Sequence, residues 1–441
     1  MKRILLIATL LLLSTTATAD RVKVRLFSNS RIEALNVSFD LGEYHLFAAD
    51  SLLEANLGEG LSVILQATAN GVHVAVNDYE YGTFKQISLR ATDTACILCL
   101  NPRNVKQRTY EGDLIISCIN STALKIINEV DFETYLAGVV QSEIYGIHSD
   151  IFRIQAIISR TWALRNMNKH KSEGYNFCDH VHCQAYQNRC IRPDIMLGTI
   201  QSSGETIVDS TGALIETPFH SNSGGETCNS EDVWRAALPY LRSVPDTFSY
   251  RMKQSNWTKV INKDKWLNYF KKTHHLNIDD PAVRDTLLNF TQEQRRAEIL
   301  GVRLTRVRSD FQLKSTFFSV SVDPNTGNVV LNGHGYGHGV GLSQEGTIRM
   351  VSLGYAYDDI IRHYYTGSSI HYNPATSKTY VSNYVKEIEQ IIAEDKANPG
   401  RVKSKKDDWL GQLFRLHDRQ IREEVFDPNK TELESDWQYS W

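Results

Sequence analysis

Beyond residue 20 the sequence lacks any apolar run close to the roughly 20 residues that a transmembrane helix needs. It also lacks a strong excess of either charge, since 48 basic and 51 acidic residues leave a formal net charge of -3. No repeat of solenoid length is present. We therefore expect no nucleic-acid partner, and the 441 residues are enough for two or three globular domains.

Residues 1–19 have the pattern of a secretory signal peptide. Two basic residues, Lys2 and Arg3, precede the apolar run 4–13, and an Ala-Thr-Ala step at 17–19 offers a cleavage site. The run is too short for a stable anchor, and no lipid-acceptor cysteine follows it. We expect an exported protein, located in the periplasm or cell envelope, with no transmembrane anchor after cleavage.

The pattern of the remaining chain predicts an α+β fold. Residues 20–124 alternate apolar and polar positions in short runs broken by Gly, Asn and Asp, which predicts a β-rich N-terminal region. Residues 125–372 mix helical and alternating patterns, with a charged, mostly helical stretch at 250–310. Residues 373–441 become strongly charged, which predicts a polar helical or partly disordered appendage.

A carboxylate ends the apolar face of one predicted helix. Asp131 is a suitable N-cap, and it is followed at helical spacing by Phe132, Leu136, Val139 and Glu143. Burial on such a face disfavours the charged form of Glu143 and raises its pKa towards the range of a general acid. The alternative is a solvent-facing glutamate at a helix end.

The stretch GHGYGHGVGLSQEG at 333–346 holds six glycines and two histidines, His334 and His338. It is not a phosphate loop, because the Lys-Ser/Thr pair is absent, and no acidic partner for a ribose is evident. We therefore expect no nucleotide or organic cofactor. Glycines disfavour a helix that would bring the two histidines to one metal, but they let the backbone approach a ligand or another segment closely. A plain tight turn is the alternative.

Two thiols and two imidazoles fall within a short stretch: His170, Cys178, His182 and Cys183. This is a ligand set for tetrahedral zinc, and four protein ligands would make the zinc structural. His180 competes with His182 for the fourth position. A Cys178–Cys183 disulfide is the alternative in an exported protein, and Cys190 could pair with Cys228. The count of seven cysteines is odd, so at least one has no disulfide partner within the chain.

Several stretches together resemble the SpoIID family, although each alone would be a weak match. They occur in family order over about residues 125–370: DFETYLAGVVQSE at 131–143, QA and SRTWAL within 155–164, CDHVHCQAY at 178–186, HSNSGG at 220–225, NSEDVW and PYL within 229–241, and GHGVGLSQ at 337–344. The resemblance implies a SpoIID-like catalytic core at 125–372.

The resemblance implies a lytic transglycosylase that cuts peptidoglycan between N-acetylmuramic acid and N-acetylglucosamine. Its substrates would be denuded strands, from which an N-acetylmuramoyl-L-alanine amidase has removed the stem peptides. Related members are described as amidase enhancers, so a non-catalytic glycan-binding role is the alternative. Partners would be glycan strands, with an amidase or a divisome protein. Because a signal peptide replaces the membrane anchor of sporulation members, a role in septal wall remodelling during division is favoured over sporulation.

The resemblance also implies roles for individual residues. Glu143 matches the family's catalytic glutamate, and some members bind zinc at the Cys/His pattern. From its position alone, on a second helix predicted from about residue 149 to 167, Arg160 is a candidate for orienting Glu143, and a surface arginine is the alternative. The expected cleft residues are Ser221, Ser223, Gly224, Gly225, His338, Ser343 and Gln344.

Overall fold

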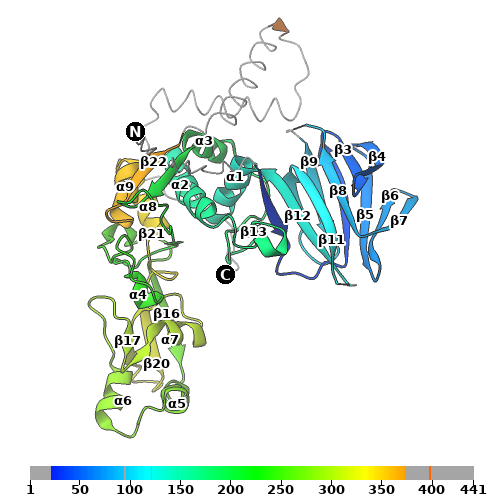
Figure 1. Ribbon diagram of the computed structural model, residues 1–441. Helices are drawn as coiled ribbons and strands as arrows, with labels where there is room; N and C mark the ends of the chain where they lie inside the picture. The colour runs from blue at the N-terminus through cyan, green and yellow to red at the C-terminus, as the bar shows by residue number, and fades with distance from the viewer. Residues whose placement is uncertain (1–20, 94–95, 121, 147, 374–396, 399–441) are drawn as a thin grey trace, which may run out of the picture.

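The computed structural model of the protein describes residues 21–93, 96–120, 122–146, 148–373 and 397–398. The signal peptide predicted at 1–19, and nearly all of the appendage predicted at 373–441, lie outside these residues. The described chain combines sheets and helices, which confirms the α+β class. It has three hydrophobic clusters, one each in a β-sandwich, a helical core and an insertion (Figure 1).

The β-sandwich is built from two sheets that share one apolar cluster. Its strands are β1 (Arg21–Leu26), β2 (Ala34–Leu41), β3 (Tyr44–Ala48), β4 (Ser51–Leu57), β5 (Ser62–Thr68), β6 (Gly71–Val76), β7 (Tyr79–Phe84), β8 (Gln86–Ala91), β9 (Ile97–Pro102), β10 (Arg108–Glu111), β11 (Asp113–Asn120), β12 (Ala123–Asp131) and β13 (Phe177–Cys178). The sheet orders are β13-β1-β12-β11-β8-β3-β4 and β10-β9-β2-β5-β6-β7. In β2 the alternating Leu35, Val37 and Phe39 are buried, as a half-buried strand requires.

The helical core follows the sandwich without a loop, because β12 ends at Asp131 and the first helix begins at Phe132. Its elements are α1 (Phe132–Glu143), α2 (Ser149–Arg165), η1 (Lys171–Glu173), α3 (Pro193–Gln201), β14 (Glu205–Val208), β15 (Phe219–His220), α4 (Ser230–Val233), η2 (Thr247–Ser249), β21 (Leu342–Ser343), α8 (Gln344–Ser352), α9 (Tyr357–Tyr364) and β22 (Ser369–Tyr372). Asp131 caps α1 by accepting hydrogen bonds from the backbone N–H groups of Glu133 and Thr134, at 2.9 and 3.1 Å. Both predicted helices are confirmed.

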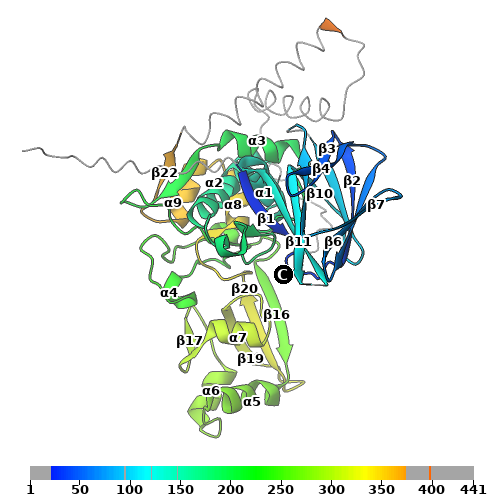
Figure 2. The same ribbon diagram turned by 45° about the vertical axis from the view of Figure 1, so that its right-hand side comes forward.

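The insertion, residues 256–334, has an apolar cluster of its own. Its elements are β16 (Asn256–Ile261), α5 (Lys263–His274), α6 (Pro281–Leu288), β17 (Glu298–Ile299), β18 (Val302–Arg303), α7 (Leu304–Asp310), β19 (Phe317–Val322) and β20 (Val329–His334). The prediction of a mostly helical stretch at 250–310 missed β16, which completes a three-stranded sheet in the order β16-β20-β19. Figure 2 shows the insertion below the core and the sandwich to the right of the core.

A buried carboxylate joins the sandwich to the core. Asp179 accepts hydrogen bonds from the backbone N–H groups of Phe27 and Ser28, at 2.6 and 3.0 Å, and from the guanidinium of Arg108 at 2.7 Å. Beside it, β13 pairs in parallel with β1. Asp179 is 3% exposed, so its charge is stable there only because these donors surround it. The loop that carries Asp179 is therefore fixed to the sandwich.

A buried ion pair holds α2 to α1. The Arg160 guanidinium donates to both carboxylate oxygens of Glu133, at 2.9 and 2.6 Å, and to the carbonyl of Ser202 at 2.8 Å. The hypothesis that Arg160 orients Glu143 is wrong, because its partner is at the opposite end of α1. A bidentate pair with further acceptors is the arrangement in which a buried arginine is tolerated.

Replacing Arg160 by Met should therefore destabilise the fold strongly, since it leaves Glu133 charged and unpaired in the core. We expect a loss of roughly 3–5 kcal/mol in the free energy of unfolding, measured by urea denaturation. The matched control is Arg165→Met on the same helix, which breaks a half-exposed pair with Glu216 and should cost about 1 kcal/mol or less. Equal losses in the two variants would contradict this account.

Candidate functional site

Glu143 is the last residue of α1, and its side chain is buried, with 4% exposed. One carboxyl oxygen accepts a hydrogen bond from the backbone N–H of Ala185 at 2.7 Å. Burial raises the pKa of Glu143 to about 7, while the bond from Ala185 acts in the opposite direction. The alternative of a solvent-facing glutamate is wrong. The carboxyl can exist in both protonation states near neutral pH, as a general acid that later becomes a base must.

The segment that follows Cys183 is fixed against the two helices of the core. Tyr135 of α1 donates its hydroxyl to the side-chain oxygen of Gln184 at 3.1 Å, and the amide nitrogen of Gln184 donates to the carbonyl of Ser159 at 3.2 Å. Ala185 is the next residue, so its N–H is held in place towards Glu143. The position of the Glu143 carboxyl thus depends on the Cys/His loop, residues 170–190.

The predicted metal ligands come together in the structure. The four ligand atoms of His170, Cys178, His182 and Cys183 all lie within 4.8 Å of one another. The Sγ atom of Cys178 is 3.6 Å from Nδ1 of His182, and Sγ of Cys183 is 3.5 Å from Nε2 of His170 and 3.8 Å from Nδ1 of His182. Zinc bonds of about 2.3 Å to sulfur and 2.0 Å to nitrogen, at tetrahedral angles, place S and N about 3.5 Å apart. The donor set fits zinc, and all seven cysteines are free, so neither proposed disulfide forms.

An outer partner orients His170 within this cluster. Its Nδ1 is 2.6 Å from a carboxylate oxygen of Glu173, while Tyr175 donates its hydroxyl to the other oxygen at 2.7 Å. These bonds lower the pKa of Glu173, which keeps it an acceptor. His170 then carries its proton on Nδ1 and turns the lone pair of Nε2 towards Cys183, as in the carboxylate–histidine–zinc arrangement of known zinc sites.

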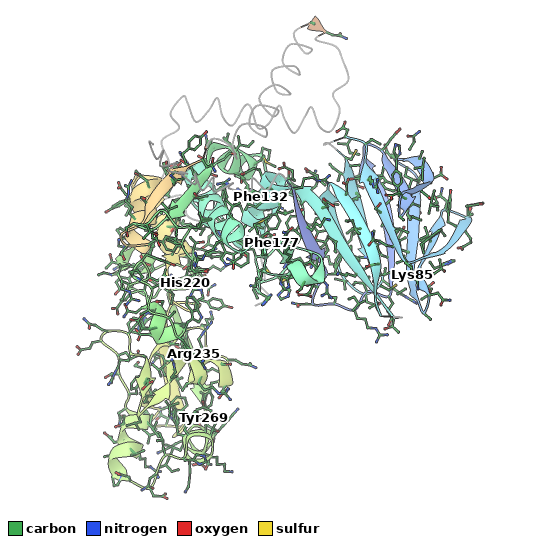
Figure 3. The ribbon with its side chains drawn as sticks, viewed as in Figure 1. Lys85, Phe132, Phe177, His220, Arg235 and Tyr269 are labelled. Atoms are coloured by element: carbon green, nitrogen blue, oxygen red, sulfur yellow. The ribbon has the colours of Figure 1, made fainter. Side chains whose placement is uncertain are left out.

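The glycine stretch packs against the 220–225 loop, so it is more than a local turn. Asn222 and Tyr336 exchange backbone hydrogen bonds of 3.1 and 2.8 Å, and β15 pairs in parallel with β21. A Cβ atom on Gly335 would lie 2.6 Å from the carbonyl oxygen of Asn222, and one on Gly224 would lie 2.6 Å from the carbonyl carbon of His334. Only glycine permits this approach. Figure 3 shows His220, at the start of the loop, where the core meets the insertion.

Three predicted cleft residues have side chains that bond within the protein. Ser223 is fully buried and donates its hydroxyl to Asp246 at 2.6 Å. Ser343 is fully buried and caps α8. Gln344 donates its amide to the carbonyl of Glu143 at 2.7 Å. The backbone N–H of Ser223 also donates to the Ser343 hydroxyl at 3.3 Å, so the 220–225 loop and the glycine stretch meet near the end of α1. Gly224 and Gly225 lie in the same loop, and Ser221 and His338 are half-buried and retain some exposure.

Sequence reasoning missed a second buried carboxyl next to Gln344. Glu345 is fully buried and accepts hydrogen bonds from the Tyr145 hydroxyl at 2.9 Å, the Asn222 amide at 2.7 Å and the Gln254 backbone at 3.0 Å. Burial raises its pKa, as it does for Asp246, which accepts from Ser223 and Tyr364. Both carboxyls tie separate segments together around the site. Glu345 lies in the glycine stretch, but the residues that donate hydrogen bonds to it are far away in the sequence.

The family described as Stage II sporulation protein, SpoIID, matches residues 120–213. This range includes α1, α2, α3 and the Cys/His loop. This match and the relatives below agree with the SpoIID resemblance that the motifs predicted. In the described residues, no helix has both the length and the apolar character needed to cross a membrane.

Three relatives show how far the similarity extends. Stage II sporulation protein D of Bacillus subtilis is 25% identical over 289 residues, which cover 61% of this chain and 82% of that protein. The protein of the same name from Bacillus amyloliquefaciens is 25% identical over 277 residues, covering 59% and 78%. The amidase enhancer of Bacillus subtilis is 22% identical over 293 residues, covering 53% of this chain and 40% of that protein.

The pKa of Glu143 predicts an unusual dependence of stability on pH. Its folded pKa of about 7 exceeds the ordinary 4.5, so the folded state favours the protonated form, and this contribution is lost as pH rises through 7. The glutamine of Glu143→Gln cannot ionise. The free energy of unfolding of this variant, relative to that of the wild type, should therefore rise by roughly 3 kcal/mol between pH 4 and pH 9. Denaturant titrations at a series of pH values measure this.

Glu231→Gln serves as a control of opposite sign. Hydrogen bonds from Arg242 lower the pKa of Glu231 to about 2, so here the wild type should gain stability over the variant as pH rises from about 2 through the ordinary 4.5. A difference between wild type and Glu143→Gln that stays constant with pH would show that Glu143 titrates like an exposed carboxyl.

Proposed function

We propose that the protein is a lytic transglycosylase acting outside the cytoplasm, which cleaves denuded glycan strands between N-acetylmuramic acid and N-acetylglucosamine during septal wall remodelling. The SpoIID match and the similarity to sporulation protein D and an amidase enhancer support a role in the cell wall. The observation that carries the enzymatic proposal is the buried carboxyl of Glu143, with its pKa near neutrality. The carboxyl accepts a hydrogen bond from the backbone N–H of Ala185, and Gln344 of the glycine stretch contacts the backbone of the same residue.

One carboxyl is sufficient for the chemistry. Protonated Glu143 donates its proton to the glycosidic oxygen, and the bond from that oxygen to C1 of muramic acid breaks. The 6-hydroxyl of the same muramic acid attacks C1 and gives its proton to Glu143, which is thereby restored. No water is consumed, and the product ends in a 1,6-anhydro sugar. Ordinary glycosidases instead need a second carboxyl for water or for a covalent intermediate.

Glu143→Gln should therefore abolish cleavage but preserve binding. The amide keeps the shape and can still accept the Ala185 hydrogen bond, but it has no proton of suitable acidity. We expect the rate of anhydro-muramic end formation on denuded strands, followed by mass spectrometry, to fall by at least 10²–10⁴-fold. Glu129→Gln, which removes a partly exposed carboxylate on β12, should cleave normally.

The rate of the wild type should also fall above pH 7, because the acid is then ionised. An active Glu143→Gln would remove Glu143 from the mechanism. Intact strands with every variant, despite binding, would replace this proposal by the second one.

The second candidate is a glycan-binding activator of an amidase that does not itself cut the strand. The match to the amidase enhancer of Bacillus subtilis favours it. In this case the amidase releases stem peptides faster when the protein is added, and Glu143→Gln activates as well as the wild type. Measuring peptide release by an amidase alongside anhydro ends separates the two candidates.

We further propose that His170, Cys178, His182 and Cys183 hold a structural zinc ion. The match of the S···N distances to a zinc tetrahedron and the outer partner Glu173 support this. Four protein ligands leave no open position for a substrate. The bound ion would fix the loop that carries Ala185, and thus the donor to Glu143.

The zinc proposal predicts one zinc ion per chain by elemental analysis of the purified protein. Cys178→Ser should lose the ion and lower the melting temperature by several degrees, because binding of a structural metal stabilises the folded state. His180→Ala is the matched control: His180 lies in the same loop but is not one of the four clustered residues, so this variant should keep the ion. Full zinc content in Cys178→Ser would refute this ligand set.

A further inference from the structure

Two arginines lie beside the glycine stretch and have no part in the proposed cleavage. Arg308 of α7 donates its Nε–H to the carbonyl of Lys314 at 3.2 Å, and the backbone N–H of Gly337 donates to the same oxygen at 2.9 Å. A Cβ atom on Gly339 would lie 3.2 Å from the guanidinium carbon of Arg295. Both guanidinium groups are therefore next to the backbone on either side of His338.

Neither guanidinium forms an ion pair with a carboxylate among the described residues, although the backbone N–H of Arg295 donates to the Glu226 carboxylate at 3.0 Å. Arg295 uses its guanidinium on the carbonyls of Glu226 and Ser223 and on the hydroxyl of Thr316. The bond from Nε to Lys314 is the one hydrogen bond that the described part of the chain gives to the Arg308 guanidinium, so both of its terminal nitrogens are free to bind a ligand. Two parallel N–H donors are the arrangement that binds a carboxylate.

The electrostatics around Arg295, Arg308 and His338, a region referred to as the corner, also favour a bound anion. Burial lowers the pKa of Arg308, and the like charge of Arg295 adds to the effect. Burial, and next the charge of Arg308, lower the pKa of His338 to about 4, so this histidine is neutral at physiological pH. Two half-buried guanidinium groups that form no ion pair in the described part of the chain are costly, and a bound anion would offset that cost.

An exposed aromatic ring lies within reach of the same corner. Trp234 is 43% exposed, and the centroid of its ring is 5.2 Å from that of the His338 ring. An indole face that is open to solvent can stack on a sugar ring, since it offers apolar area at little entropic cost. Six residues after His338, Gln344 contacts the backbone of Glu143. The glycine stretch therefore runs from this corner to the end of α1, where Glu143 lies.

We propose that Arg308, with Arg295 beside it, binds the lactyl carboxylate of a muramic acid residue in the denuded strand, while Trp234 stacks on a sugar ring. This inference rests on the proposed function. When an amidase removes the stem peptide, the lactyl amide becomes a carboxylate, so a denuded strand carries a negative charge where a peptide-bearing strand carries a neutral amide. The arginines thus give the site a way to recognise the missing peptide.

The test measures binding separately from cleavage. Glu143→Gln protein, which does not turn over, is titrated by calorimetry with denuded glycan fragments, with the same fragments after conversion of their carboxylates to methylamides, and with peptide-bearing fragments. We expect the acid form to bind about tenfold or more tightly than the methylamide, the ratio that one charge-assisted hydrogen bond supplies. Adding Arg308→Gln should reduce this ratio towards one.

Arg306→Gln is the matched control, because it removes the same charge from the same helix. Arg306 is exposed and pairs with Asp310 at 2.7 Å, so its loss should leave the ratio unchanged. Circular dichroism checks folding, and if Arg308→Gln does not fold, Arg308→Lys decides, since lysine keeps the charge but lacks the paired donors and should lower the ratio.

The inference would be overturned if Glu143→Gln bound the acid and methylamide fragments equally, or if its preference for the acid survived the change at Arg308. It would also be overturned if Arg308→Gln weakened the binding of peptide-bearing fragments alone, since the ligand would then be a carboxylate of the stem peptide. A wild-type protein that leaves strands uncut but keeps the preference would refute the cleavage proposal alone.

Discussion

The hydrogen bond from the backbone of Ala185 to the carboxyl of Glu143 is the contact around which the site is organised. It joins the end of α1 to the loop that follows the Cys/His cluster. The Cys/His loop that carries Ala185 is fixed in three ways. Asp179 bonds it to the sandwich, Gln184 bonds it to α1 and α2, and its cysteines and histidines cluster together. A buried carboxyl with a single donor is sensitive to small displacements of that donor, which explains why so much of the fold converges there.

The same helix, α1, holds two buried glutamates with different partners. Glu133, near the N-terminus of α1, accepts two hydrogen bonds from the guanidinium of Arg160. Glu143, at the C-terminus, has no cationic partner in any described contact and lies where the helix dipole is negative. Both are buried to a similar degree, with 3% and 4% exposed, so burial alone does not distinguish a structural carboxylate from a reactive one. What distinguishes them is the partner.

Local sequence patterns predicted the parts of the protein that depend on local physics. The cap at Asp131 and the apolar stripe gave α1 and its terminal carboxyl, alternation gave the sandwich strands, and the spacing from His170 to Cys183 gave the clustered donors. The patterns could not supply Glu345 or Arg308, because their neighbours come from segments scattered along the chain. They also suggested cleft roles for Ser223 and Ser343, whose side chains are fully buried, since a hydroxyl in a motif does not show whether its partner is ligand or protein.

The insertion enters and leaves the core through neighbouring strands, since Asn256 of β16 lies opposite His334 of β20. Its ends are thus already joined by a ladder of backbone hydrogen bonds, and its apolar cluster is its own. A segment with this topology can lengthen, shorten or be exchanged during evolution without disturbing the helices that carry Glu143. Arg308 and Arg295 belong to that replaceable segment, whereas Glu143 belongs to the core, so descendants of this chain could change the ligand they recognise while retaining the bond they act on.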